Sequence, residues 1–124
     1  VAEYLRGHEA VEFVNYNAFE DFGTHALANK YLKNGYGSIL TFGIRGGREA
    51  GRQVIDSVKL FSHVANVGDA RSLIIHPAST THQQLSAEDL MTAGVSEGLI
   101  RLSIGLEAIE DIIADLAQAI AAVK

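Results

Sequence analysis

Arg101 is the residue whose type and position most directly suggest chemistry. It stands in "GLIRLSI" (98–104), where Ile100, Leu102 and Ile104 share one face and Arg101 lies on the other. Burying a guanidinium without an anion is costly, and its planar group suits a carboxylate held by two parallel hydrogen bonds. The run therefore indicates an anion-binding arginine or, as a more common alternative, an internal salt bridge or an arginine on a wet sheet face.

A second candidate is the run "LIIHPASTTHQQL" (73–85), which contains the only proline of the chain. Its apolar start and polar end predict a strand that finishes in a rigid, hydrogen-bonding loop. Thr80 and Thr81 are suited to brace such a loop through nearby backbone groups. His76 and His82 are six residues apart, which matches no usual metal spacing, so structural or solvent-facing histidines are favoured here and elsewhere in the chain.

The glycines of "FGIRGG" (42–47) raise the possibility of a phosphate-binding loop, because they lead into a predicted helix. The segment lacks both the G-x-G-x-x-G pattern and the lysine and hydroxyl of a P-loop. Tight packing between a strand and a helix explains these glycines better. No nucleophile–histidine–acid arrangement or pair of catalytic carboxylates can be specified from the spacing.

The composition narrows the class of protein. The chain has 124 residues, 48% hydrophobic and 20% charged, which suits one globular domain. Its net charge of −5 without a basic cluster argues against nucleic-acid binding. No apolar run approaches the roughly 20 residues of a membrane span. The absence of cysteine fits the cytoplasm. Because the chain starts with valine and Met91 is its only methionine, we expect a piece of a longer protein.

Hydrophobic periodicity predicts alternating helices and strands. Helices are expected at 1–7, 25–35, 46–61 and 107–123, and strands at 11–16, 38–44, 61–66, 72–76 and 98–104. The last helix has the clearest apolar stripe, with acidic residues in its first turn. Since several connections are short, the fold class is α/β (α+β): a two-layer sandwich with a small, mostly antiparallel sheet and helices on one face. The open face must meet water, a ligand or another domain.

Two long segments, "NVGDARSLIIHPASTTHQQL" (66–85) and "GVSEGLIRLSIGLEAIEDIIADL" (94–116), resemble the Cys/Met-metabolism family of pyridoxal-phosphate (PLP) enzymes. The likeness also includes "VNY", "HALANKYL", "ILTFGIRGG" and "FSHVANVGDA", so it covers nearly the whole chain. It implies that residues 1–124 form the C-terminal small domain of such an enzyme. Within the family, "HPASTTHQQL" is most similar to the O-acetylhomoserine sulfhydrylases.

The resemblance assigns roles to three residues. In the family, the arginine that matches Arg101 grips the substrate α-carboxylate. The position of Asn66 also meets this carboxylate, largely through its backbone, and the position of Thr81 lines the same pocket. The loop at 73–85 would then brace the carboxylate end of an amino-acid site, with His76 and Pro77 shaping it rather than reacting.

The resemblance also implies what lies outside this chain. The family's cofactor lysine, its stacking tyrosine and its phosphate-binding groups belong to a large PLP-binding domain. Lys30 is not expected to be the cofactor lysine, because it falls in a helix that is non-catalytic in the family. The isolated segment is therefore expected to be inactive. Its partners would be the large domain of the same enzyme and a small amino-acid substrate, in a cytoplasmic homotetramer.

The implied reaction replaces the acetate of O-acetylhomoserine with sulfide or a thiol, giving homocysteine or methionine, with PLP as the electron sink. Arg101 would orient the substrate. A cystathionine γ-synthase, a cystathionine γ-lyase or a methionine γ-lyase is the enzymatic alternative. A free-standing, non-catalytic binding module is the alternative from another class of protein.

Overall fold

The computed structural model describes residues 1–123, and Ala87 by its backbone alone. Along the chain the elements are α1 (Ala2–Arg6), β1 (Val11–Asn15), α2 (His25–Tyr31), β2 (Ile39–Ile44), α3 (Gly47–Ser57), β3 (Leu73–Ile75), a 3₁₀ turn (Pro77–Ser79), α4 (Ala87–Thr92), β4 (Leu99–Ser103) and α5 (Ile109–Ala121).

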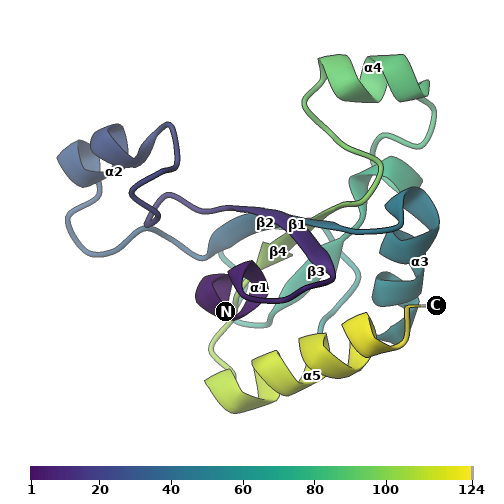
Figure 1. The fold of residues 1–124 in the computed structure, drawn as a ribbon. Coiled ribbons are helices and arrows are strands. Elements are labelled where there is room, and N and C mark those ends of the chain that lie inside the picture. The colour runs from purple at the N-terminus through teal and green to yellow at the C-terminus, as the bar shows by residue number, and fades with distance from the viewer. Residues whose placement is uncertain (124) are drawn as a thin grey trace.

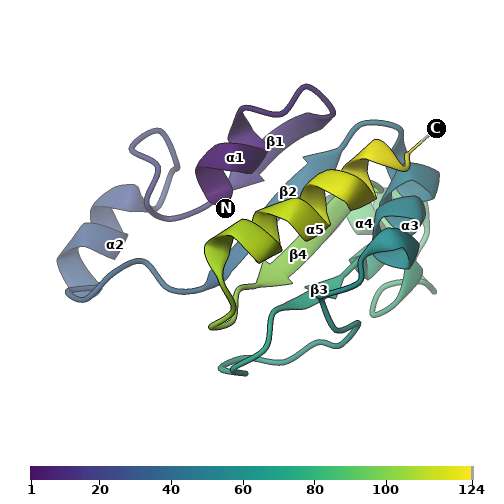
Figure 2. The ribbon, with the colours of Figure 1, turned by 90° about the horizontal axis from the view of Figure 1, so that it is seen from below.

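The strands form one four-stranded sheet in the order β1-β2-β4-β3, and every neighbouring pair is antiparallel. Helices α1, α3 and α5 cover one face of this sheet (Figure 2), while α2 and α4 project away from the body of the molecule (Figure 1). The predicted two-layer α/β sandwich is therefore confirmed. Within residues 1–123, no helix layer covers the opposite face of the sheet.

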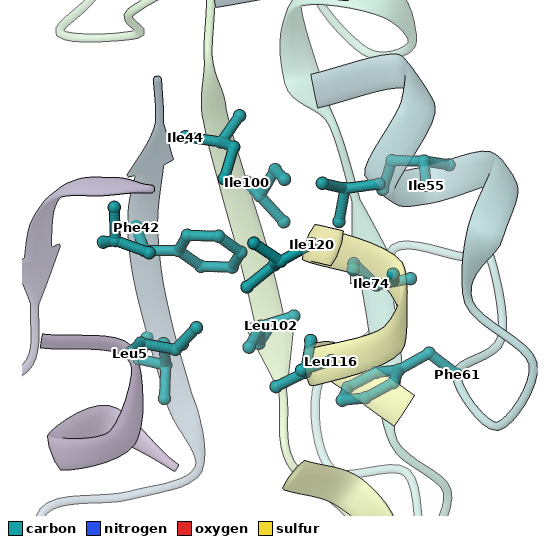
Figure 3. Close-up of a cluster of buried hydrophobic side chains, with 14 of the residues drawn as sticks. Leu5, Phe42, Ile44, Ile55, Phe61, Ile74, Ile100, Leu102, Leu116 and Ile120 are labelled. Carbon is teal, nitrogen blue, oxygen red and sulfur yellow. The ribbon is translucent and has the colours of Figure 1, made fainter. Parts of the chain in front are cut away.

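The core lies between the sheet and its three helices (Figure 3). Phe42 and Ile44 of β2 and Ile100 and Leu102 of β4 are almost fully buried there, as period-2 alternation predicted. Each such side chain stabilises the fold by about 1.5–3 kcal/mol relative to an exposed one. The covering residues come from all three helices and include Leu5, Val54, Ile112, Leu116 and Ile120.

Helix α3 ends earlier than the apolar pattern predicted. The expected helix ran to Phe61, but α3 stops at Ser57. The buried carboxylate of Asp115 accepts hydrogen bonds from the backbone N–H groups of Lys59, Leu60 and Phe61 at 2.8–3.3 Å. A side chain 54 or more residues away thus satisfies the donors that a longer helix would have used.

Three other segments also differ from the predictions. Helix α2 ends at Tyr31, before Gly35. The expected strand at 61–66 is reduced to one parallel bridge between Ser62 and Leu73. Helix α4 was missed, although Ser86 is an N-cap whose side-chain oxygen accepts a hydrogen bond from Asp89 N at 3.1 Å. The signal was present as Ser-x-x-Asp, a variant of the capping pattern.

Candidate functional site

A row of side chains crosses the open face of the sheet through Arg101. Strand register places Asn15 opposite Thr41, Thr41 opposite Arg101, and Arg101 opposite Ile75. Directly opposite residues in antiparallel strands share a face. The side chains of Asn15 and Thr41 are joined by a hydrogen bond of 3.1 Å. The open face therefore carries a polar row that ends at the guanidinium.

Arg101 is half-buried in the middle of β4, beside a shallow hollow of about 360 Å³ lined by Ala65, Asn66, Val67, Ile75 and Arg101 itself. Its Nη2 donates a hydrogen bond of 3.1 Å to the backbone carbonyl of Asn66. Within residues 1–123, Arg101 forms no ion pair. A guanidinium has five N–H donors, so most of its hydrogen-bonding capacity is available to a ligand.

The structure brings Asn66 to Arg101 although 35 residues separate them. The Asn66 side chain is turned back on its own loop, where Oδ1 accepts a hydrogen bond of 2.8 Å from Val67 N. Asp69 Oδ1 accepts another from Arg71 N at 2.9 Å. The hydrogen bond from Arg71 N lowers the pKa of Asp69 by more than burial raises it. The positive charge of Arg71 lowers this pKa further. Asn66 thus meets Arg101 through its backbone.

Thr81 lies elsewhere, in the exposed part of the loop that follows the 3₁₀ turn. Its Oγ1 is 2.8 Å from His82 Nδ1. It lines a separate hollow formed by residues 80–85, which does not include Arg101. In the described part of the chain, Arg101 and Asn66 are therefore in contact, whereas Thr81 lies away from both.

His76 holds the loop together from inside. The side chain is fully buried, with Nε2 2.6 Å from Glu97 O and Nδ1 2.9 Å from Ser79 Oγ. Burial lowers its pKa, the bond to the Glu97 carbonyl opposes this, and the charges of Arg48 and Arg52 lower the pKa further. The hydroxyls of Ser79 and Thr80 both donate to the His76 carbonyl. This geometry agrees with a shaping role for His76.

Other kinds of site find no support in residues 1–123. No group of three or more histidine, cysteine, aspartate or glutamate side chains there could hold a metal ion. None of the helices in this range combines the length and apolar character that crossing a bilayer requires. Lys30 is exposed on α2, where its ammonium lies 5.1 Å from the centre of the Tyr31 ring.

Sequence reasoning did not single out Asn15 and Thr41 as neighbours of Arg101. Alternation in "SILTFGI" did put Thr41 on the face away from the core. Its partner across the sheet depends on the pairing of β2 with β4, which one sequence does not specify. The sequence therefore indicated on which face of the sheet Thr41 lies. It did not give the register between β2 and β4, which decides that Thr41 lies beside Arg101.

Comparison with known proteins gives one family over nearly the whole chain. A family model described as "Cys/Met metabolism PLP-dependent enzyme" matches residues 1–121. The homocysteine synthase of Schizosaccharomyces pombe is 52% identical over 120 residues, covering 97% of this chain and 28% of that protein. An O-acetyl-L-homoserine sulfhydrylase of Leptospira meyeri is 50% identical over 121 residues, covering 97% of this chain and 27% of that protein. The chain thus spans less than a third of the length of these relatives.

Two solved structures also match nearly the whole chain. A crystal structure described as an O-acetylhomoserine (thiol)-lyase of Campylobacter jejuni matches with a TM-score of 0.88 and 47% identity, covering 97% of this chain and 28% of that one. It contains N'-pyridoxyl-lysine-5'-monophosphate. A cystathionine gamma synthase of Xanthomonas oryzae matches with a TM-score of 0.86 and 38% identity, covering 98% of this chain and 31% of that one.

Proposed function

The chain belongs to the Cys/Met-metabolism family of PLP-dependent enzymes, and we propose that it forms the small C-terminal domain of an O-acetylhomoserine sulfhydrylase. The intact enzyme would replace the acetate of O-acetylhomoserine with sulfide or a thiol. Identities of 50% and 47% to proteins with that activity in their descriptions, against 38% to a cystathionine gamma synthase, support this choice.

The cofactor would be held outside this chain. Lys30, Lys33 and Lys59, the lysines of residues 1–123, are all exposed. A lysine that forms a Schiff base is activated by desolvation or by a neighbouring cation, so these lysines do not fit PLP. PLP supplies the electron sink in this chemistry, and a large domain of the same enzyme would bind it. No catalytic step is assigned to residues of this chain.

The contribution of this domain would be to bind and orient the substrate through Arg101. The observation that carries this proposal is a half-buried guanidinium that has one carbonyl partner and no counter-ion in residues 1–123. An α-carboxylate in the neighbouring hollow would accept two parallel hydrogen bonds from it. A carboxylate fixed in this way also fixes the rotation of the amino acid, which is what reaction at its γ-carbon requires.

Asn66 and Thr81 would complete the substrate site. The carbonyl of Asn66 holds one edge of the guanidinium at 3.1 Å, which leaves the other N–H groups for the carboxylate. The assignment of Thr81 rests on the family resemblance alone. In this proposal Thr81 would reach the pocket wall once the large domain covers the open face. The intact enzyme would be a cytoplasmic homotetramer, for which the cysteine-free composition and the family resemblance are the support.

A substrate panel tests the proposal. The full-length enzyme with O-acetylhomoserine and sulfide should release acetate and homocysteine, and with methanethiol it should form methionine. The 124-residue chain mixed with PLP and the same substrates should give no homocysteine above the free-cofactor background. Efficient use of cysteine to form cystathionine, or elimination from methionine or cystathionine in preference to sulfhydrylation, would assign a sister activity instead. Turnover by the isolated chain would refute the proposal that a separate large domain binds the cofactor.

A further inference from the structure

Ser72 closes the loop that presents Asn66. Its carbonyl accepts a hydrogen bond from Ser62 N at 3.0 Å, and Ile74 N donates to Ser62 O at 3.0 Å. These two bonds pair the start and the end of the segment 62–74. Within the described chain, residues 65–69 of this segment form hydrogen bonds only with their near neighbours in sequence. The exception is the bond that the Asn66 carbonyl accepts from Arg101. The placement of Asn66 therefore depends on how firmly Ser72 is held.

Glu107 holds Ser72 with both carboxylate oxygens. Oε1 accepts from Ser72 N at 2.7 Å and Oε2 from Ser72 Oγ at 2.8 Å. The Ser72 hydroxyl also accepts from Gly105 N at 2.9 Å. Burial opposes ionisation of Glu107, but the bonds from Ser72 and from its own backbone outweigh this and lower its pKa. The carboxylate is thus charged at neutral pH.

The same contact links the loop to the strand that carries Arg101. Leu106 N donates to Ala70 O at 2.9 Å, next to the bond between Gly105 and Ser72. A Cβ added to Gly105 would lie 2.5 Å from Ala70 O and from Arg71 C, so the two backbones meet here without space for a side chain. Gly105 follows Ser103, the last residue of β4, by two positions. The two segments that meet at Arg101 and Asn66 are therefore fastened together a second time at Glu107.

We propose that Glu107 is a positioning residue for the substrate carboxylate: it fixes Ser72, and through Ser72 it sets the place of Asn66 against the Arg101 guanidinium. This inference rests on the proposed role of Arg101. Glu107 is not among the residues that line the hollow, so in this proposal it would not touch the substrate. It acts by keeping the guanidinium in one orientation, with one edge on the Asn66 carbonyl and the other directed to the ligand.

A carboxylate is the group that this position requires. Ser72 presents two donors, an N–H and an O–H, and an ionised carboxylate accepts both. In Glu107→Gln one oxygen becomes an NH₂ donor, so the Ser72 hydroxyl proton loses its acceptor while the shape of the side chain is kept. Glu110, in the first turn of α5, is exposed and provides a matched control for the loss of one negative charge nearby.

The test is steady-state kinetics of the full-length enzyme with O-acetylhomoserine and with its carboxamide analogue. Glu107→Gln should raise KM for O-acetylhomoserine about tenfold and change kcat by less than about threefold, because a displaced guanidinium weakens carboxylate binding. Its preference for the acid over the amide should fall by a similar factor. Glu110→Gln should behave as the wild type. If Glu107→Gln fails to fold, Ser72→Ala, which removes only the hydroxyl, should show the same shift at about threefold.

A double-mutant cycle separates positioning from general stability. In the Arg101→Ala background, Glu107→Gln should reduce kcat/KM by less than about twofold, since the group that it positions is gone. An equal loss in both backgrounds, or an equal loss for the acid and the amide, would overturn the inference while leaving the role of Arg101 intact. If Arg101→Ala itself keeps kcat/KM within about twofold of the wild-type value, Arg101 does not bind the carboxylate. The proposed role of Glu107 is then wrong as well.

Discussion

Two features of Arg101 bear on whether it binds an anion. It is half-buried in the central strand pair, and in residues 1–123 it has a carbonyl partner but no carboxylate. The salt-bridge alternative is therefore not supported by the structure. A charge that is partly removed from water without a counter-ion favours the binding of an anion, which is the physical basis of the proposed substrate site.

His76 predicts a pH dependence of stability. Burial and the nearby charges of Arg48 and Arg52 lower its pKa in the folded state, so below pH 6.5 the unfolded chain binds this proton more readily than the folded one. Stability should be complete above pH 6.5 and should fall as the pH decreases toward the folded pKa, by at most about 1.4 kcal/mol per pH unit.

Chemical denaturation between pH 5 and 8 measures this effect. His76→Gln should lower the overall stability but flatten the pH slope by up to about 1.4 kcal/mol per unit, because the titrating group is gone. Gln84→Ala, which changes no ionisable group at an exposed position of the loop after His76, should keep the wild-type slope. An unchanged slope in His76→Gln would show that other groups cause the dependence.

For a single residue, the sequence could predict the face of the strand on which its side chain lies. It could not predict which residue, distant in the sequence, this side chain contacts. The alternation around Arg101 correctly placed its side chain on the other face of β4 from Ile100 and Leu102, which lie in the core. Its bond to Asn66, by contrast, depends on the loop 63–71, which is closed by the hydrogen bond between Ser62 and Ser72. Loop geometry of this kind has no periodic signature. Only the family resemblance pointed to Asn66, and the proposed role of Thr81 has the same single source.

Among the elements, helix α3 shows how a side chain contact can outweigh local propensity. Gly51 lies within α3, where alanine would favour the helix by about 1 kcal/mol. A Cβ at this position would lie 2.5 Å from His76 Nε2 and 2.7 Å from Cδ2. His76 is fully buried and both ring nitrogens are hydrogen-bonded, so it cannot move away without losing a bond.

We therefore expect Gly51→Ala to destabilise the protein by about 1–3 kcal/mol, despite its better helix propensity. Asp56→Ala, at an exposed position of the same helix, serves as the control and should stabilise slightly, through better helix propensity and the loss of a negative charge near the helix C-terminus. Urea denaturation of both variants provides the comparison. A more stable Gly51→Ala protein would mean that the contact between α3 and His76 is loose.

The elements themselves were largely predictable, whereas their ends were not. Strands β2 and β4 and helix α5 follow clear apolar periods, and the structure confirms them. The end of α3 is set by Asp115, whose partners are 54–56 residues earlier in the chain. A tertiary hydrogen bond here overrides an apolar pattern that continues to Phe61.

For the whole molecule, exposed apolar side chains predict that another surface covers this chain. Leu106 is 87% exposed, Val67 76%, Met91 72% and Tyr31 68%. Helices α2 and α4, which carry two of these residues, project from the sandwich with few contacts of their own (Figure 1). Large exposed apolar areas usually mark interfaces, and a large domain of the same enzyme is the partner that we propose.

The isolated chain should therefore self-associate or bind a dye that reports apolar surface. Leu106→Glu should weaken both effects, because it places a charge beside the apolar groove lined by Val1, Leu40, Ile104 and Ile109. Sedimentation at high concentration and dye fluorescence are the measurements. A strictly monomeric chain without dye binding would argue against a covered face.

The role of Arg101 in the full-length enzyme is the most direct test of this account. Arg101→Ala removes a charge-assisted pair of hydrogen bonds worth roughly 1.5–3 kcal/mol, so kcat/KM for O-acetylhomoserine should fall about 10- to 100-fold. Arg101→Lys should recover only part of the loss, because an ammonium cannot form the fork. Arg71→Ala, which removes an exposed arginine from the neighbouring loop, should have little effect. Cofactor absorbance and thermal stability should stay unchanged in all three variants. If Arg101→Ala keeps kcat/KM within about twofold, or unfolds the domain, then Arg101 is a structural residue and the central claim is wrong.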